Sequence, residues 1–375
     1  MTPPTTGSQP IRAAVVGLGW AGRSIWLPRL LAHPGFSVAA AVEPQQSARE
    51  AFAEASPDIP VLADIDQLDP ELIDLAIVAV PNHLHARIAA RLLERGLPVF
   101  LEKPVCLSSA EADQLAAAEA AGGAVLLAGS AAQYRADIGA LAELIPSLGR
   151  IRYVELAWVR ANGVPGAGGW FTRRELAGGG ALVDLGWHLL DTLRPLLGPV
   201  DFRQVVGSTS GDFISAQSHG ASWRADEPTA DQWRSGDVED TARGFLVTDE
   251  GIAVSLRASW ASHEAPDRTV LRVEGSAGVA SLECTFGFSP NRAGGSRLTV
   301  TRHGVSTPVV LPDEPIGSEY DRQLDIIQTQ LIDSQQRGET IGDVRRTIAV
   351  IERLYDSARS NPGRDPERVA VQVAG

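Results

Sequence analysis

Lys103, in the stretch FLEKPVCL, is the only lysine of the chain, although lysine and arginine together number 33. Guanidinium stays protonated in proteins, whereas an ammonium can shift its pKa on burial and share a proton with a substrate. Two interpretations follow. The lysine is a chance survivor of a biased composition, or it marks a position where an exchangeable proton is needed. Its sequence surroundings favour the second interpretation.

A second group of titratable residues lies in the stretch GGGALVDLGWHLLD. From Ala181 this stretch predicts a helix, because leucines recur at three and four residues. Asp184, His188 and Asp191 then share another face at i, i+4 and i+7. His188 has three interpretations: a structural histidine held by Asp184, a metal ligand, or an acid–base group oriented by a carboxylate. No third metal ligand lies within motif reach, so we predict no metal.

The stretch IRAAVVGLGWAG combines an apolar run with the pattern G-x-G-x-x-G. Glycines between a strand and a helix allow a tight turn and let backbone N–H groups approach a pyrophosphate. The pattern alone is unspecific, but a helical segment and a second strand-like segment follow it. We therefore predict that a dinucleotide binds the turn formed by Gly17, Gly19, Trp20, Ala21 and Gly22.

Glu43 ends the second predicted strand. An acidic side chain at this position can accept hydrogen bonds from a ribose 2′-OH and would repel a 2′-phosphate. The alternative is an ordinary surface glutamate at a strand end. We predict NAD as the cofactor, while Arg49, close in sequence, leaves NADP open.

Strand-like and helix-like segments alternate up to about residue 130, which predicts a parallel, doubly wound sheet. Ligands bind such sheets at the carboxyl ends of the strands. The stretches PNHLH and EKP both fall at predicted strand ends. We therefore expect further cofactor contacts from Pro81, Asn82, His85, Glu102 and Lys103.

The pattern changes in the second half, where a run of strand-like segments predicts a large, mostly antiparallel sheet open on one face. The predicted fold class is α/β, with an N-terminal Rossmann domain and a C-terminal α/β domain. We predict an arm at 1–10, the Rossmann domain at 11–131 and the second domain at 132–375, whose last helices can return to the first. The polar segment 211–236, with Trp223 and Trp233, is a substrate lid or a subunit contact.

Composition narrows the function classes. The net charge of −13 disfavours binding to nucleic acid or to an anionic membrane surface. No run of about 18 apolar residues predicts a membrane span, and the N-terminus has no basic and apolar pattern of a secretory signal. Two cysteines form no metal or disulfide pattern. We expect a cytoplasmic protein.

Four motifs in this order carry a family resemblance: VVGLGWAG, VPNHLH, LEKPV and GGGALVDLGWHLLD. The chain resembles the glucose–fructose oxidoreductase, inositol dehydrogenase and rhizopine-catabolism (Gfo/Idh/MocA) family over roughly residues 11–360. The resemblance implies an NAD(P)-binding Rossmann domain and a second domain for substrate and for homodimer or homotetramer contacts. It implies Lys103, Asp184 and His188 as catalytic residues. Gln133 departs from the family, which commonly has arginine there.

The predicted activity is the NAD-dependent, reversible oxidation of a secondary alcohol on a cyclic polyol, a sugar or a sugar derivative. His188 would exchange the hydroxyl proton, Asp184 would orient the imidazole, and Lys103 would stabilise the alkoxide. Two alternatives remain: ketone or imine reduction or net non-redox chemistry on the same fold, and a dinucleotide sensor without catalysis. Candidate substrate contacts are Gln133, Trp158, Arg160, Trp170 and His188, of which the two tryptophans and Arg160 are equally open to a core or interface role.

Overall fold

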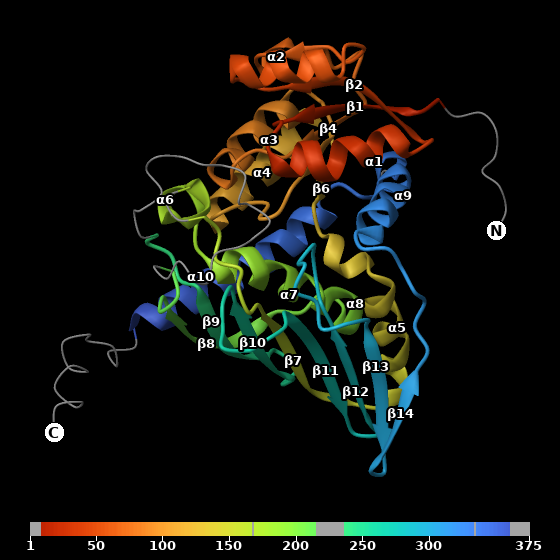
Figure 1. Ribbon diagram of the computed structural model, residues 1–375, viewed down its shortest axis with the longest axis vertical. Helices are drawn as coiled ribbons and strands as arrows, with labels where there is room; N and C mark the ends of the chain where they lie inside the picture. Colours follow the sequence, from red (N-terminus) through yellow and green to blue (C-terminus); the bar gives the residue numbers. More distant parts are fainter. Residues whose placement is uncertain (1–8, 167–168, 215–235, 334, 361–375) are drawn as a thin grey trace. The chain divides into compact units, whose positions relative to one another are not determined.

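The structure is a computed structural model that describes residues 9–166, 169–214, 236–333 and 335–360. The chain divides into two compact units (Figure 1). The first takes the chain up to Tyr134 together with Pro315–Arg345, and the second takes Arg135–Glu314 and the chain from Arg346. Most of the predicted arm and of the predicted loop at 211–236, including Trp223 and Trp233, lies outside the described residues.

A six-stranded parallel sheet with the order β3-β2-β1-β4-β5-β6 forms the first unit. Its strands are β1 (Ile11–Val16), β2 (Phe36–Val42), β3 (Val61–Leu62), β4 (Leu75–Val78), β5 (Val99–Leu101) and β6 (Leu126–Ala128). The strand order reverses between β1 and β4, and this switch point is where dinucleotides bind in such sheets. The predicted doubly wound sheet is therefore confirmed.

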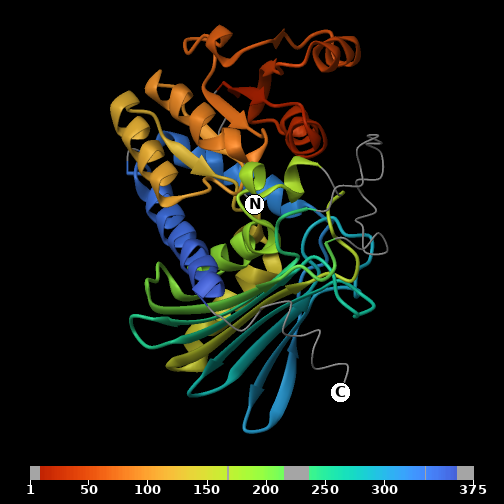
Figure 2. The same cartoon turned by 90° about the vertical axis from the view of Figure 1, so that its left-hand side faces the viewer.

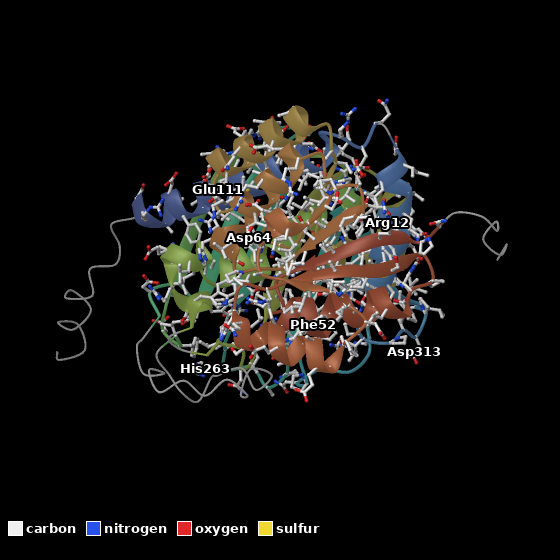
Figure 3. All side chains as sticks on the ribbon, turned by 90° about the horizontal axis from the view of Figure 1, so that it is seen from above. Arg12, Phe52, Asp64, Glu111, His263 and Asp313 are labelled. Atoms are coloured by element: carbon white, nitrogen blue, oxygen red, sulfur yellow. The ribbon has the colours of Figure 1, made fainter. Side chains whose placement is uncertain are left out.

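Helices cover this sheet because its central strands are apolar on both faces. Every residue of β4 is buried, as expected for a strand between two helical layers. The helices of the first unit are α1 (Leu27–Ala32), α2 (Gln46–Ala55), α3 (His85–Glu94), α4 (Ser109–Gly122) and α9 (Ser318–Ile332). At the amino end of β1, Arg12 forms an ion pair with Asp74 at 2.8 Å (Figure 3 labels Arg12).

The second unit contains an eight-stranded sheet with the order β14-β13-β12-β11-β7-β10-β9-β8. Its strands are β7 (Ile151–Val159), β8 (Phe202–Ser210), β9 (Thr241–Thr248), β10 (Ala253–Ser259), β11 (Arg268–Gly275), β12 (Val279–Cys284), β13 (Arg297–Arg302) and β14 (Val305–Val309). Only β7 and β10 pair in parallel among these neighbours, so the prediction of a mostly antiparallel sheet is confirmed.

One face of the second sheet carries the helices of that unit (Figures 1 and 2). They are α5 (Ala136–Leu144), α7 (Trp187–Asp191), α8 (Leu193–Leu197) and the C-terminal part of α10 (Glu339–Ser360). The short helix α6 (Arg174–Ala177) of the same unit contacts the 3₁₀ turn Trp170–Thr172. Gly207 and Gly244 pair across β8 and β9, and Leu354 of α10 lies over both, where a Cβ would come within 2.6 and 2.7 Å of its Cδ2. The two glycines therefore form the notch that seats this helix.

The opposite face of the second sheet has no helix of the described chain on it. Strand residues alternate, so that Val154, Leu156 and Trp158 of β7 face the helices while the residues between them face outward. Val206 and Phe245 pair across β8 and β9 on the outward face and are 60% and 51% exposed. No helix among the described residues is long and apolar enough to cross a membrane.

Candidate functional site

The glycine turn after β1 adopts the shape that a dinucleotide requires. Gly17 has a φ of +94°, and its N–H donates to Val42 O at 2.8 Å. A Cβ on Gly22 would lie 2.0 Å from Gly17 O, so the following helix can approach the strand only without a side chain there. A Cβ on Gly19 would meet no heavy atom within 4 Å. The turn thus has tight packing at two glycines and open space at the third, and it fits a bound pyrophosphate.

These differences between the glycines predict different defects. Gly22→Ala is expected to lower Tm by several degrees because the new methyl group overlaps backbone, a defect of about 1–3 kcal/mol. Gly19→Ala is expected to keep the wild-type Tm but to weaken NAD binding about tenfold, because its methyl group enters the space left for the ligand. Thermal unfolding and calorimetric titration with NAD measure both. Equal Tm values for the two variants would contradict this assignment.

Glu43 lies beside this turn. Its Oε2 accepts from Leu18 N at 3.1 Å and its Oε1 from Gln45 N at 3.0 Å, so two backbone amides fix the carboxylate at the end of β2. Arg49 donates its Nη1 to the carbonyl oxygens of Glu43 and Pro44 at 2.9 and 2.7 Å. Glu43 is therefore fixed at the end of β2 and its contact with a ribose stays a prediction, while the Arg49 guanidinium lies against the same backbone.

His85 occupies the region between the ends of β4 and β5 but is buried. One ring nitrogen lies 2.7 Å from Pro104 O and the other 2.8 Å from Val80 O. Burial lowers the pKa of this imidazole, and the two carbonyl groups partly offset that effect. Because both nitrogens face backbone, His85 joins the loops on either side of the site, and its contact with the cofactor stays a prediction. Asn82, at the start of the 3₁₀ turn Asn82–Leu84 after Pro81, is also buried.

Glu102 connects the glycine turn to Lys103. Its Oε1 accepts from Trp26 Nε1 at 2.7 Å, and its Oε2 accepts from Lys103 N at 2.9 Å. Trp26 ends the π-helical turn Ala21–Trp26 and is fully buried. Burial raises the pKa of Glu102, while Lys103 and the two hydrogen bonds lower it. Glu102 directly follows the last residue of β5 and fixes this strand end, Lys103 comes next, and a cis peptide links Lys103 to Pro104.

Asp184 lies in the second unit, in a π-helical turn at Leu182–Gly186 that runs directly into α7. Its Oδ2 accepts from Trp260 Nε1 at 2.9 Å, and Trp260 is fully buried. His188 follows in α7. The predicted helix is confirmed, but its first turn is wider than an α-helix, because Trp187 N donates to Leu182 O five residues earlier. Whether Asp184 and His188 share one helix face stays a prediction.

Aromatic side chains surround this helix within the second unit. The rings of Trp158 and His188 lie 5.7 Å apart, and Phe286 and Arg160 also contact the Trp158 ring, at 5.3 and 4.9 Å. Trp170 is partly exposed and lies 4.8 Å from Phe171, whose ring is 6.1 Å from Trp260. A chain of rings therefore runs from Trp170 to the tryptophan that holds Asp184.

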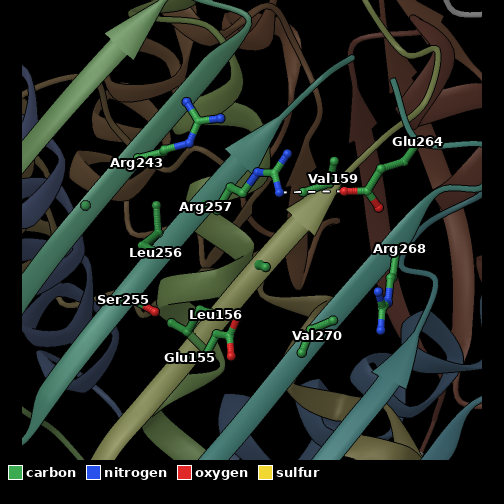
Figure 4. A pocket seen from close by; sticks show the side chains of 12 residues that line it. Glu155, Leu156, Val159, Arg243, Ser255, Leu256, Arg257, Glu264, Arg268 and Val270 are labelled. Carbon is green, nitrogen blue, oxygen red and sulfur yellow. Dashed lines mark ion pairs between the residues drawn. The ribbon is translucent and has the colours of Figure 1, made fainter. Parts of the chain in front are cut away.

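A shallow depression on the open face of the second sheet is a separate feature (Figure 4). It is lined by outward side chains such as Glu155, Arg243, Arg257 and Arg268, with an ion pair between Arg257 and Glu264 at 3.6 Å. Trp158 points to the other face of the same sheet. The depression therefore belongs to the outward face and not to the candidate catalytic helix.

The predicted site residues divide between the two units. Lys103, Glu43, the glycine turn and Gln133 belong to the first unit, and Asp184 and His188 belong to the second. Their convergence on one substrate carbon stays a prediction. Among the described residues no group of three or more His, Cys, Asp or Glu side chains is arranged to hold a metal ion. Trp26 and Trp260, which the motifs did not indicate, donate to the carboxylates of Glu102, which precedes Lys103, and of Asp184.

Comparison with known proteins matches both halves of the chain to one family. Residues 11–130 match the oxidoreductase family with an NAD-binding Rossmann fold, and residues 141–281 match the GFO/IDH/MocA C-terminal domain. A putative UDP-kanosamine synthase oxidoreductase subunit of Amycolatopsis mediterranei (strain S699) is 58% identical over 354 residues, which cover 94% of this chain and 98% of that protein.

Two further similarities are more distant. D-glucoside 3-dehydrogenase of Escherichia coli (strain K12) is 26% identical over 67% of this chain and 72% of its own length. The crystal structure of GenD2 from gentamicin A biosynthesis, in complex with NAD, has a TM-score of 0.76 at 25% identity and covers 97% of this chain and 98% of that one. With the glycine turn, the E-K-P strand end and the Asp184–His188 helix all in place, this chain belongs to the Gfo/Idh/MocA family of NAD(P)-binding oxidoreductases that act on sugar-like substrates.

Proposed function

We propose that this protein oxidises the hydroxyl at carbon 3 of a nucleotide-linked hexose to a ketone, reversibly and with NAD. The single observation that carries this proposal is the 58% identity, over nearly the whole of both chains, to a protein named as the oxidoreductase subunit of a UDP-kanosamine synthase. Kanosamine is an amino sugar, and carbon–nitrogen bond formation at a hydroxyl-bearing carbon commonly proceeds through a ketone. Carbon 3 is supported by the similarity to D-glucoside 3-dehydrogenase.

His188 and Lys103 have complementary roles in this reaction. NAD, when bound, supplies the acceptor for the hydride that leaves the carbon. His188 takes the hydroxyl proton, so that the loss of one hydride and one proton leaves the C=O group, and it returns the proton in the reverse direction. Lys103 donates a hydrogen bond to the oxygen as negative charge develops on it. Asp184, held by Trp260, orients the imidazole.

The substrate contacts are assigned by exposure within the second unit. Trp170 is partly exposed, and we assign it to the sugar face. Trp158 is covered by His188, Phe286 and Arg160, so we assign it to the support of the His188 ring instead of to sugar stacking. Gln133, in the 3₁₀ turn Ala131–Tyr134 of the first unit, remains a proposed substrate contact.

Glu43 supports a preference for NAD over NADP. Its carboxylate is fixed by two backbone amides beside the glycine turn, where it would accept from the ribose and repel a 2′-phosphate. Arg49 lies close in sequence and could favour NADP by binding its 2′-phosphate. Its Nη1 already donates to two backbone carbonyl oxygens, which makes it a weaker argument for NADP.

The ketone requires a second enzyme if an amino sugar is the end product. Transfer of an amino group to a ketone by pyridoxal phosphate needs a lysine that forms a Schiff base with the cofactor. This chain has one lysine, Lys103, and the proposed reaction uses it beside NAD. We therefore infer that a separate aminating protein consumes the product.

A second copy of the chain is the proposed partner for the open sheet face. Val206 and Phe245 form an exposed apolar pair there, and burial of such a pair favours association. Phe245→Arg is expected to shift the protein toward monomer in light scattering after gel filtration. Ile332→Arg, at an 85% exposed residue at the end of α9, is the matched control and should leave the oligomer unchanged. A wild-type monomer, or a Phe245→Arg oligomer equal to wild type, would contradict the assignment.

Absorbance at 340 nm tests the proposed activity. We expect NADH to form with UDP-glucose, and to accumulate further when an aminating enzyme or hydroxylamine removes the ketone. The rates with free glucose, inositol and dTDP-glucose, compared with the rate with UDP-glucose, show how much the nucleotide contributes to substrate recognition. If NAD raises Tm while no member of this panel is oxidised, and no ketone is reduced with NADH, the sensor interpretation replaces the enzymatic one.

A further inference from the structure

Glu239 is a buried carboxylate that lies just before β9 and is 4% exposed. Its Oε1 accepts hydrogen bonds from Gly180 N at 2.9 Å, Leu182 N at 3.0 Å and the Tyr355 hydroxyl at 2.8 Å. Its Oε2 accepts from Arg174 Nη2 at 3.3 Å. Every one of these partners is a donor, so the arrangement satisfies an ionised carboxylate.

Gly180 and Leu182, which Glu239 holds, each accept a backbone hydrogen bond from the helical segment that carries Asp184 and His188. Gly180 O accepts from Asp184 N at 3.0 Å. Leu182 O accepts from the N–H of Trp187, the residue before His188. The carboxylate therefore holds the N–H groups of Gly180 and Leu182, the same two residues whose carbonyl oxygens accept from the π-helical turn. Asp184 and His188 depend on that turn for their positions.

The glycines before this turn are explained by the same contact. A Cβ on Gly179 would lie 1.9 Å from the Tyr355 hydroxyl oxygen, and a Cβ on Gly180 would lie 1.7 Å from Glu239 O. Glu239 O also accepts from Ala181 N at 3.0 Å. Gly179 and Gly180 therefore make room for Tyr355 and Glu239.

The electrostatic effects on Glu239 oppose one another. Burial raises its pKa, and its hydrogen bonds and Arg174 offset only part of that effect, so the pKa stays above its ordinary value. The Arg174 guanidinium lies 5.1 Å from the centre of the Tyr355 ring, so the cation contacts both members of the pair. A negative charge at the start of a helical segment is favourable because backbone N–H groups point toward it. Replacing the Glu239 carboxylate with an amide would change one of its two acceptor oxygens into an NH₂ group. That NH₂ group would then face groups that are themselves hydrogen-bond donors.

We propose that Glu239, braced by Tyr355, is a positioning residue for hydride transfer: it sets the place of Asp184 and His188 by holding the backbone at Gly180 and Leu182. This inference rests on the proposed function for its catalytic consequence. The structural part of the proposal is that Glu239 holds the π-helical turn in place. This part depends only on contacts within the second unit and can be measured without a substrate.

Glu239→Gln tests the kinetic consequence. We expect kcat to fall about 10- to 100-fold with KM and the Kd for NAD changed by less than about threefold, because a misplaced acid–base group slows chemistry without removing binding contacts. Tyr355→Phe removes one hydrogen bond but keeps the carboxylate, and we expect a smaller fall of about 3- to 10-fold. Glu119→Gln is the matched control, since Glu119 is a buried glutamate that accepts from Leu126 N and Gly338 N in the first unit. It should lower Tm without lowering kcat selectively.

Hydrogen–deuterium exchange tests the structural part. In Glu239→Gln, amides of the peptide 180–191 should exchange faster than in wild type, while Glu119→Gln leaves that peptide unchanged. Wild-type exchange there, or wild-type kcat, would overturn the proposal. If wild-type protein oxidises no sugar, the proposed function fails and exchange alone decides whether Glu239 holds the turn. If Glu239→Gln does not fold, the same two measurements on Tyr355→Phe decide.

Discussion

Lys103→Arg is expected to lower kcat/KM for the sugar by about 10²- to 10⁴-fold while leaving NAD affinity near wild type. Arginine keeps the charge, but its planar, bulkier guanidinium cannot place a single donor where the ammonium does. Glu102 fixes the backbone N–H of residue 103, so both side chains start from the same strand end. Lys103→Met removes the charge as well and should lose at least as much activity. Full turnover in Lys103→Arg would contradict the assigned role.

The composition of the chain allows a second test of the same residue. Lys103 carries the only side-chain amine, so an acylating reagent modifies that amine and the N-terminus alone. We expect acylation at Lys103 to abolish turnover, and NAD with sugar to slow it. Peptide mass spectrometry locates the modification, and Lys103→Arg serves as the control because only its N-terminus reacts. Activity that survives complete modification of Lys103 would contradict the prediction.

The two sheets were predictable because their signals are local. Leu75–Val78 is an unbroken apolar run, which is typical of a parallel strand between helices, and the structure buries all of it. Ile151–Val159 alternates, and the structure places Trp158 inward and Glu155 outward. Each pattern lies within one segment of sequence, so the type of each strand could be predicted without knowing which strands it pairs with.

The π-helical turns could not be read in this way. Hydrophobic spacing indicates a helix but does not separate i→i+4 from i→i+5 hydrogen bonds. The wide turn at Leu182–Gly186 follows Gly179 and Gly180, whose close contacts are with Tyr355 and Glu239. The one at Ala21–Trp26 contains Gly22, which packs against Gly17 O. The relation between Asp184 and His188 therefore depends on packing that periodicity does not contain.

Contacts with residues distant in sequence also determine whether a titratable side chain is available to a ligand or supports the fold around the site. His85 has the residue type and the strand-end position of a ligand contact, yet carbonyl oxygens of Val80 and Pro104 take both its nitrogens. Glu239 and Tyr355 are separated by 116 residues, and nothing in their local sequence indicates their contact. Motif spacing predicted the candidate site residues, whereas the residues that support them are identified by contacts between segments far apart in sequence.

His188→Asn is the second change expected to have a large effect, a loss of about 10²- to 10⁴-fold in kcat/KM. Asparagine can hydrogen-bond a hydroxyl but cannot accept its proton at neutral pH. Oxidation needs a group that accepts the hydroxyl proton and reduction needs a group that returns it, so the variant should lose activity in both directions. His303→Asn, at an exposed position in the second unit with a φ of 50° that asparagine tolerates, should match wild type.

Asp184→Asn separates orientation of the imidazole from an independent role for the carboxylate. If Asp184 acts through His188, the double variant Asp184→Asn/His188→Asn should be about as slow as His188→Asn alone, because residues that act as a unit are not additive. Additive losses would instead assign Asp184 its own contact with the substrate. Trp260→Phe, which removes the indole N–H that donates to Asp184 Oδ2 but keeps an aromatic ring, should give a smaller loss of the same kind. The expected order of losses is therefore His188 first, then Asp184, and then Trp260, whose indole N–H holds the Asp184 carboxylate.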